Sequence, residues 1–190
     1  MNHIAIVGGP NGAGKTTAAQ VLLPRGLELI EFINADEIAR GLSPFNAEAV
    51  AVPAGRIMIG RTRDLANSGT SFAFETTCAG HSSLRIVGNC KAMVWQATLL
   101  FLWLPSPQLA LERVRRRVRS GGHAIPSEVV VRRYWAGLIN MRARYLALAD
   151  VAAIYDNSDR GRILVASKSA GASLDVHDAK RWAMIEGATP

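Results

Sequence analysis

Short apolar runs alternate along the chain with longer segments of helical periodicity, a pattern typical of a mostly parallel α/β sheet. The runs that predict strands are residues 4–7, 27–33, 71–74, 95–104 and 151–155, with a shorter sixth run at 163–165. Apolar spacings of three and four predict helices over 15–23, 46–67, 108–119, 131–148 and 176–185. We expect a kink at Pro53. The pattern predicts a single domain, residues 1–190, with five to six strands.

A phosphate-binding loop is predicted directly after the first strand. Residues 9–16 match G-x-x-x-x-G-K-[ST] in full and lie between a predicted strand and a predicted helix. Glycines let such a loop wrap a phosphate with its N–H groups pointing inward, and the helix N-terminus adds positive potential. Lys15 would reach the β- and γ-phosphates of a nucleoside triphosphate, and the Thr16 hydroxyl would ligate Mg²⁺.

This loop does not fit a dinucleotide-binding fold, because G-x-G-x-x-G is absent and Lys15 would have no role there. We expect Lys15 to face solvent in the absence of nucleotide. The residues predicted to bind the nucleotide are Gly9, Pro10, Asn11, Gly12, Ala13, Gly14, Lys15, Thr16 and Thr17.

Three acidic residues stand at the ends of predicted strands: Asp36, Glu75 and Asp156. A kinase needs one carboxylate to accept the proton of the acceptor hydroxyl and others to order Mg²⁺. Structural interpretations compete with these roles. Asn34 could cap a short helix with Asp36 in its first turn, Glu75 could cap the next turn, and Asp156 could begin an exposed turn. From the residues alone, both interpretations of each acid stay open.

The net charge of +7 is concentrated in one segment. Nine of the 18 arginines fall between Arg113 and Arg144, where Glu128 is the only acid. The segment could be a nucleic-acid surface, a solvated helix face or a lid over bound phosphates. A lid explains more, because arginine-bearing helices flank the flexible pair Gly121-Gly122 and would bring guanidinium groups to the phosphoryl group. Nucleic acid is disfavoured, because aromatics and lysines are scarce there.

The compartment is indicated by what the chain lacks. Cys78 and Cys90 fit no metal or redox spacing and suit a reducing environment. The most apolar stretch, residues 92–104, is too short to span a membrane, and the first residues do not read as a secretory signal. We expect a cytoplasmic protein that does not associate with membranes.

Five motifs together resemble the zeta toxin family of P-loop kinases. They are GPNGAGKTT at 9–17, FINAD at 32–36, FETT at 74–77, GGHAIP at 121–126 and YDNS at 155–158. The first is common to P-loop proteins, while the other four together are specific to this family. The resemblance covers about residues 1–160. It implies a P-loop NTPase three-layer sandwich like that of nucleoside monophosphate kinases, with an arginine-rich helical lid at about residues 113–133.

The resemblance also implies a reaction and its residues. The reaction is ATP-dependent, Mg²⁺-dependent phosphorylation of a sugar hydroxyl on UDP-N-acetylglucosamine or a similar UDP-amino sugar. In a toxin, a small antitoxin protein would block the nucleotide site. By position, Asp36 would be the base, Arg113 would contact ATP phosphates and Asn157 would lie near the adenine. The acceptor sugar would be held by Glu75 and Thr76, with the neighbouring Asn34 and Thr77 assigned to the same site.

His123 departs from the family pattern, because the well-studied toxins have an arginine at this place in the lid. An imidazole is charged only when protonated, with an ordinary pKa of about 6.5, and nearby polyphosphate should raise that pKa. A catalytic His123 therefore predicts that turnover falls above neutral pH. The structural alternative is a histidine that caps the lid helix.

Two other functions compete with a UDP-sugar kinase: a P-loop ATPase or nucleotide-dependent regulator, and a kinase that acts on another metabolite without toxin activity. A Walker B aspartate after four apolar residues, with a water-positioning acid, would favour the ATPase. Asp36 directly after a strand and the arginine-rich lid favour the kinase.

Overall fold

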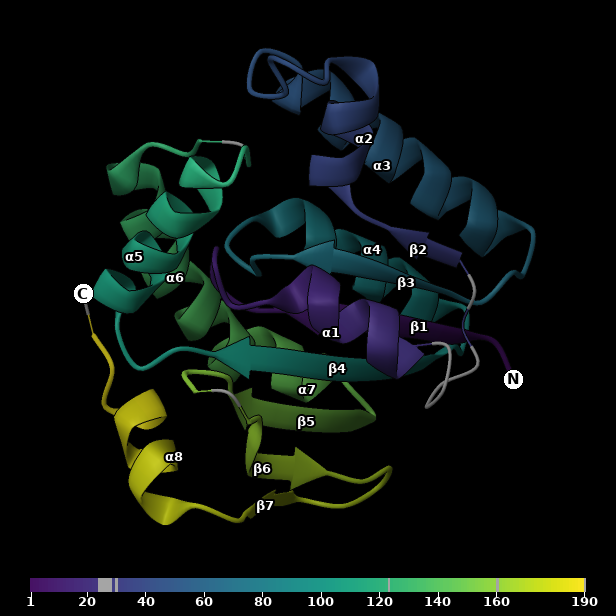
Figure 1. The fold of residues 1–190 in the computed structure, drawn as a ribbon. Coiled ribbons are helices and arrows are strands. Elements are labelled where there is room, and N and C mark those ends of the chain that lie inside the picture. Colours follow the sequence, from purple (N-terminus) through teal and green to yellow (C-terminus); the bar gives the residue numbers. More distant parts are fainter. Residues whose placement is uncertain (24–28, 30, 123, 160, 190) are drawn as a thin grey trace.

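A seven-stranded sheet in the order β2-β3-β1-β4-β5-β6-β7 runs through the molecule (Figure 1). The computed structural model describes residues 1–23, 29, 31–122, 124–159 and 161–189. β1 to β5 are mutually parallel, whereas β6 and β7 are added antiparallel at one edge. The strands are β1 His3–Gly8, β2 Glu31–Ile33, β3 Phe72–Thr76, β4 Gln96–Trp103, β5 Val151–Asp156, β6 Ile163–Lys168 and β7 Leu174–Val176.

Helices cover both faces of the sheet, which gives the predicted three layers (Figure 1). In β1, Ala5 and Val7 pack with Ala19 of α1, while Ile4 and Ile6 belong to a larger apolar cluster on the other face. β1 is therefore apolar at successive positions, as a strand buried on both faces must be. The helices are α1 Lys15–Leu22, α2 Ala35–Leu42, α3 Ala51–Asn67, α4 His81–Ala92, α5 Pro107–Arg119, α6 Ser127–Asn140, a π-helical turn Met141–Tyr145, α7 Leu146–Leu148 and α8 Ala179–Glu186.

The C-terminal segment differs from the prediction in two ways. The sheet has a seventh strand, β7, where at most six strands were expected. The helix predicted to begin at Val176 begins at Ala179, because the Asp178 side chain caps it by accepting a hydrogen bond from the Arg181 N–H at 2.9 Å. Val176 is instead the last residue of β7.

The helix predicted over 46–67 starts later and has no kink at proline. α2 ends at Leu42 and α3 begins at Ala51. Pro53 lies in the first turn of α3, where a missing N–H leaves no helical hydrogen bond broken. α4 escaped prediction, because it buries only Val87 and Cys90 and so carries a narrow apolar stripe.

The two arginine-bearing helices are anchored in the core. Ala110 and Val114 of α5 and Val130 and Leu138 of α6 are buried in the main apolar cluster. α5 matches the helix predicted over 108–119, and the second predicted helix, over 131–148, is divided into α6, the π-helical turn and α7. The closing motion of a lid at about residues 113–133 stays a prediction.

Among the helices that the structure describes, none has the length and apolar character needed to cross a lipid bilayer.

Candidate active site

The phosphate-binding loop joins the end of β1 to the start of α1. Gly9 has φ +142° and Gly14, the N-cap of α1, has φ +79°, values that side chains rarely adopt. A Cβ atom on Gly9 would lie 2.3 Å from the carbonyl oxygen of Leu102 in β4, so no larger residue fits there. The backbone therefore forms the cradle that the motif predicts.

Lys15 is buried, and the expectation that it faces solvent is wrong. Its side chain is only 6% exposed, Nζ donates to the Pro10 carbonyl at 3.0 Å, and Nζ lies 3.5 Å from Oε1 of Glu75. β3 runs parallel to β1 with Glu75 in register with Val7, which places the carboxylate beside the loop. A bound phosphate would therefore share Lys15 with Glu75.

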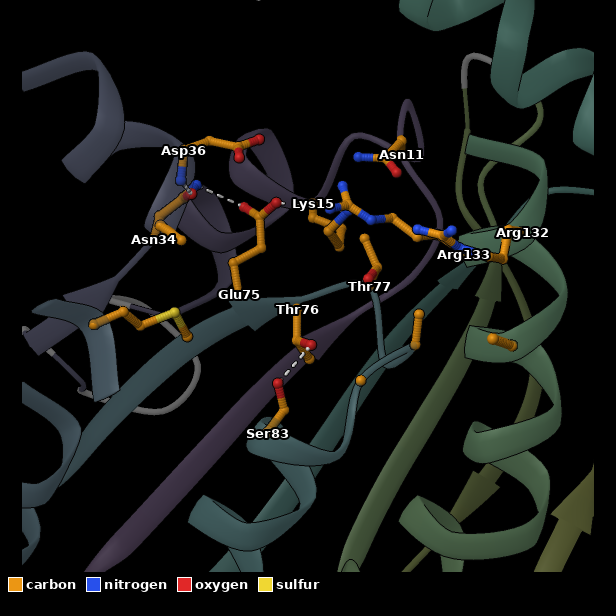
Figure 2. Close-up of a pocket in the computed structure, with 15 residues that line it drawn as sticks. Asn11, Lys15, Asn34, Asp36, Glu75, Thr76, Thr77, Ser83, Arg132 and Arg133 are labelled. Atoms are coloured by element: carbon orange, nitrogen blue, oxygen red, sulfur yellow. Dashed lines mark hydrogen bonds and ion pairs between the residues drawn. The ribbon is translucent and has the colours of Figure 1, made fainter. Parts of the chain in front are cut away.

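Glu75 is the centre of a polar network at the mouth of the loop (Figure 2). Its Oε2 accepts hydrogen bonds from Thr16 Oγ1 at 2.7 Å and from Asn34 Nδ2 at 2.9 Å. Asn34 also caps α2, because its Oδ1 accepts from the Asp36 N–H at 2.8 Å. Asn34 thus has the capping role considered for it, whereas Glu75 contacts the nucleotide-binding motif rather than the turn that follows it.

The oxygen atoms around Thr16 fit a magnesium–nucleotide complex. Mg²⁺ is usually held by one or two carboxylates together with phosphate oxygens and water, and here Thr16 and Glu75 offer adjacent oxygens. Over the described part of the chain, no group of three or more histidine, cysteine and acidic residues could form an all-protein metal site. Asn11 Oδ1, within the loop, is buried without a hydrogen-bond partner among the described residues, as expected of an atom that contacts a bound ligand.

Two cavities meet at Asp36. The first, called here the P-loop cavity, has a volume of about 300 Å³ and is lined by the loop, α2 and α5. The second, the α6 cavity, has a volume of about 470 Å³ and is lined by α2, α6 and the segment after β3. Asp36 lies exposed in the first turn of α2, and it lines both cavities. The four residues common to the two cavities are Asn11, Lys15, Asp36 and Glu75.

Arginines line both cavities, and several of them had no role predicted from the sequence. Arg132 and Arg133 reach the α6 cavity from α6, on the side opposite Asp36 (Figure 2). The sequence placed them in the arginine-rich segment without giving either a role. Arg40 of α2, which sequence reasoning missed, lines the P-loop cavity together with Arg117. The sequence feature that could have identified Arg40 is its position one helical turn after Asp36.

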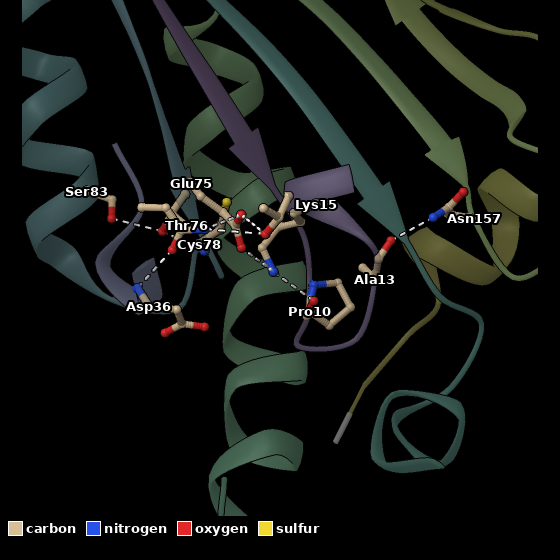
Figure 3. A network of polar contacts seen from close by, with 11 residues as sticks. Pro10, Ala13, Lys15, Asp36, Glu75, Thr76, Cys78, Ser83 and Asn157 are labelled. Atoms are coloured by element: carbon tan, nitrogen blue, oxygen red, sulfur yellow. Dashed lines mark hydrogen bonds and ion pairs between the residues drawn. The ribbon is translucent and has the colours of Figure 1, made fainter. Parts of the chain in front are cut away.

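Arg113 and Asn157 link the phosphate-binding loop to the segment that follows β5. The Arg113 guanidinium donates to the carbonyl oxygens of Asn157, at 2.8 Å, and of Ser158. Asn157 Nδ2 donates to the Ala13 carbonyl at 2.7 Å (Figure 3). Arg113 also lines the P-loop cavity. Its phosphate contact and the adenine contact of Asn157 stay predictions.

Asp156 has a structural role in a buried position, not at the exposed turn that the sequence suggested. It is buried, and its Oδ1 accepts from the Ser158 N–H at 2.9 Å while Oδ2 accepts from Arg181 Nε at 2.8 Å. It lines neither of the two cavities described above. The turn at the end of β5 is therefore fixed by this carboxylate.

Thr76 and Thr77 line the α6 cavity with the residues that follow them. Thr76 Oγ1 lies 2.9 Å from Ser83 Oγ and accepts from the Cys78 N–H at 3.0 Å (Figure 3). Burial raises the pKa of the Cys78 thiol to about 12, so this cysteine is no nucleophile near neutral pH. His123 lies outside the described residues, and its predicted role remains a prediction.

Comparisons with known proteins place the fold among P-loop kinases. No protein-family model matches the chain. An uncharacterized protein of Haemophilus influenzae is 29% identical over 126 residues, which cover 66% of this chain and 88% of that protein. The AvrRxo1-ORF1:-ORF2 complex with ATP superposes with a TM-score of 0.73 and 18% identity over 97% of this chain, which spans only 63% of that chain's length.

Two further solved structures agree with this placement. A structure of the PezAT chromosomal toxin-antitoxin system of Streptococcus pneumoniae gives a TM-score of 0.66 at 16% identity, covering 100% of this chain and 80% of that one. A gluconokinase from Sinorhizobium meliloti gives 0.53 at 15% identity, covering 83% of each chain. The chain therefore has the P-loop kinase fold that its motifs predict.

Proposed function

We propose that the chain is a kinase that transfers the γ-phosphoryl group of ATP to a hydroxyl group of a small molecule. The observation that carries this proposal is the pair of cavities that share Asn11, Lys15, Asp36 and Glu75. One cavity is built on the phosphate-binding loop, and the other has room for a second substrate, since ligand sites usually enclose about 300–1,000 Å³. Transfer between two bound molecules needs such a junction.

On the nucleotide side, the cradle and Lys15 bind the phosphates of ATP. Mg²⁺ supplies the charge that neutralises the β- and γ-phosphate oxygens, and Thr16 and Glu75 are the residues that would hold it. Glu75 contacts the ammonium group of Lys15 and the hydroxyl of Thr16, and so holds both side chains in place before the nucleotide arrives. The side chains are thereby ordered in advance of the reaction.

Asp36 is the proposed base. Within the described residues its carboxylate has no hydrogen-bond or ion-pair partner, so both oxygens are free to accept the proton of an acceptor hydroxyl. The Asn34 side chain fixes the backbone at this residue. A base in this position lies between donor and acceptor, as the transfer geometry requires.

For the acceptor we propose a UDP-amino sugar such as UDP-N-acetylglucosamine. The support is the FINAD and FETT motifs, of which residues 34–36 and 75–77 line the α6 cavity, together with Arg132 and Arg133 on its far wall. Arginines bind diphosphate oxygens through paired N–H groups. A kinase for another metabolite is the alternative.

We further propose that a small antitoxin protein binds this chain and covers the nucleotide site. The support is the resemblance together with two of the solved structures, whose descriptions name an AvrRxo1-ORF1:-ORF2 complex and a toxin-antitoxin system. Co-expression with the product of an adjacent small gene tests this. Co-purification with loss of ATP binding is the expected result, and unchanged ATP binding in a stable complex would contradict it.

The reaction is tested by product analysis. The chain is incubated with Mg-ATP and a panel of UDP-sugars, free sugars and nucleosides, and the products are identified by mass spectrometry. We expect one UDP-amino sugar to gain a single phosphoryl group. ADP release without any phosphorylated acceptor would instead favour the ATPase.

Replacing Glu75 by glutamine should raise the Mg²⁺ concentration needed for half-maximal turnover by roughly 10–100-fold, as for other residues that support a metal site. The reason is that the carboxylate contacts Thr16, the residue predicted to ligate the metal. Glu37→Gln, in the same cavity, is the matched control. A larger effect on the acceptor KM than on the Mg²⁺ requirement would support the acceptor role that the resemblance implies for Glu75.

A further inference from the structure

α6 approaches the segment after β3 so closely that only glycine fits at the contact. A Cβ atom on Gly137 would lie 2.2 Å from the Thr77 carbonyl oxygen. Glycine is unfavourable in the interior of a helix, so a glycine at position 137 needs a reason. The close approach to Thr77 supplies that reason. Gly88 in α4 has no atom within 4 Å of its Cβ position, which makes it the natural reference for the same change.

One turn further along α6, Asn140 holds the same segment by its backbone. Its Nδ2 donates to the Cys78 carbonyl at 2.9 Å and lies 3.4 Å from the Ala79 carbonyl oxygen. Cys78 has φ +59°, a left-handed conformation that costs energy for a residue with a side chain. Thr76 Oγ1 accepts the Cys78 N–H. The strained residue is therefore held on both sides.

The residues of α6 that precede Gly137 form a wall of the α6 cavity. Arg132, Arg133 and Ala136 line it from the helix, while Thr77 and Ala79 line it from the held segment. A single helix thus carries one wall of the cavity and fixes the position of another.

We propose that Gly137 and Asn140 form a clamp that positions residues 76–80 against Arg132 and Arg133 for acceptor binding. This inference rests on the proposed function, in which the α6 cavity is the acceptor site. Gly137 and Asn140 are positioning residues, because they line neither cavity and act through the backbone of the clamped segment. A shift of that segment by about 1 Å is enough to misplace a substrate by catalytic standards.

The test compares Asn140→Ala and Asn140→Asp with Ile139→Ala, an exposed neighbour on the same helix. With UDP-N-acetylglucosamine as acceptor, Asn140→Ala should raise the acceptor KM by roughly 10–100-fold while the ATP KM is unchanged. Asn140→Asp should be worse than Asn140→Ala, because a carboxylate would face two carbonyl oxygens. A residue that merely fills space would not give this order.

Amide hydrogen exchange provides an arm that does not depend on the acceptor. Exchange in residues 76–80 should become faster in Asn140→Ala and in Gly137→Ala, and should be unchanged in Ile139→Ala and Gly88→Ala. If the wild-type chain leaves UDP-N-acetylglucosamine unphosphorylated, the proposed acceptor fails, and exchange alone decides on the clamp. Equal exchange in Asn140→Ala and the wild-type chain, or an equal rise of both KM values, would overturn the clamp.

Discussion

Lys15→Ala is expected to abolish phosphoryl transfer while the chain keeps its fold. The ammonium group is the one charge that the loop itself brings to the β- and γ-phosphates, and loss of a group that stabilises transition-state charge costs about 10²–10³-fold or more in turnover. The measurement is turnover under saturating Mg-ATP, with thermal unfolding to show that the fold persists.

The burial of Lys15 adds a stability effect to this prediction. Its removal leaves the Glu75 carboxylate without its ion-pair partner, but Thr16 and Asn34 still donate to that carboxylate. We therefore expect a modest loss of stability of about 1–3 kcal/mol. Lys15→Met, which keeps the apolar stem, should lose activity as completely and stability less. Turnover equal to wild type in either variant would end the P-loop kinase interpretation.

The phosphate-binding loop could be predicted from sequence because all its determinants are local. Gly9 to Thr16 carry the motif, and residues 4–7 of the strand before it are all apolar. Glu75 shows the limit of such reasoning. Its contact with Lys15 depends on β3 lying beside β1 in a register that pairs Val7 with Glu75, 68 residues apart in the chain. No local pattern encodes that pairing.

The elements that were missed or misplaced in the prediction from sequence have weak apolar patterns. β7 has only three residues, two of them exposed, and α4 buries two side chains. The Asp178 cap sets the start of α8. This capping residue is visible in the sequence, but the apolar periodicity placed the predicted start at Val176. Arg132 and Arg133 could be assigned to the arginine-rich segment, but only the packing of α6 shows which cavity they line.

The three acids illustrate how tertiary contacts separate equal candidates. Asp156 follows the apolar residues 151–155, as a Walker B aspartate would, yet Arg181 and the Ser158 N–H bind its two oxygens. The Walker B aspartate that would favour the ATPase is therefore not supplied by Asp156. Glu75 contacts the P-loop residues, and Asp36 lines both cavities. Only Asp36 combines this shared position with a carboxylate that has no partner among the described residues.

Asp36→Asn should accordingly lower turnover by about 10²–10⁴-fold, the usual contribution of a positioned general base, with ATP affinity nearly unchanged. Asparagine keeps the size of the side chain and the backbone N–H that Asn34 accepts. It removes only the first-turn charge of α2, worth about 0.3–1 kcal/mol. The measurement is kcat with the identified acceptor, beside the Kd for Mg-ATP.

Glu37→Gln separates the base from general electrostatics. Glu37 is the next residue on α2, lines the P-loop cavity and contributes the same first-turn charge, but it pairs with Arg40. Its neutralisation should leave kcat close to that of the wild-type chain. If Asp36→Asn mainly weakens Mg-ATP binding, Asp36 belongs to the metal site. Equal losses of kcat in both variants would mean that charge at the start of α2, rather than proton transfer at Asp36, is what the reaction requires.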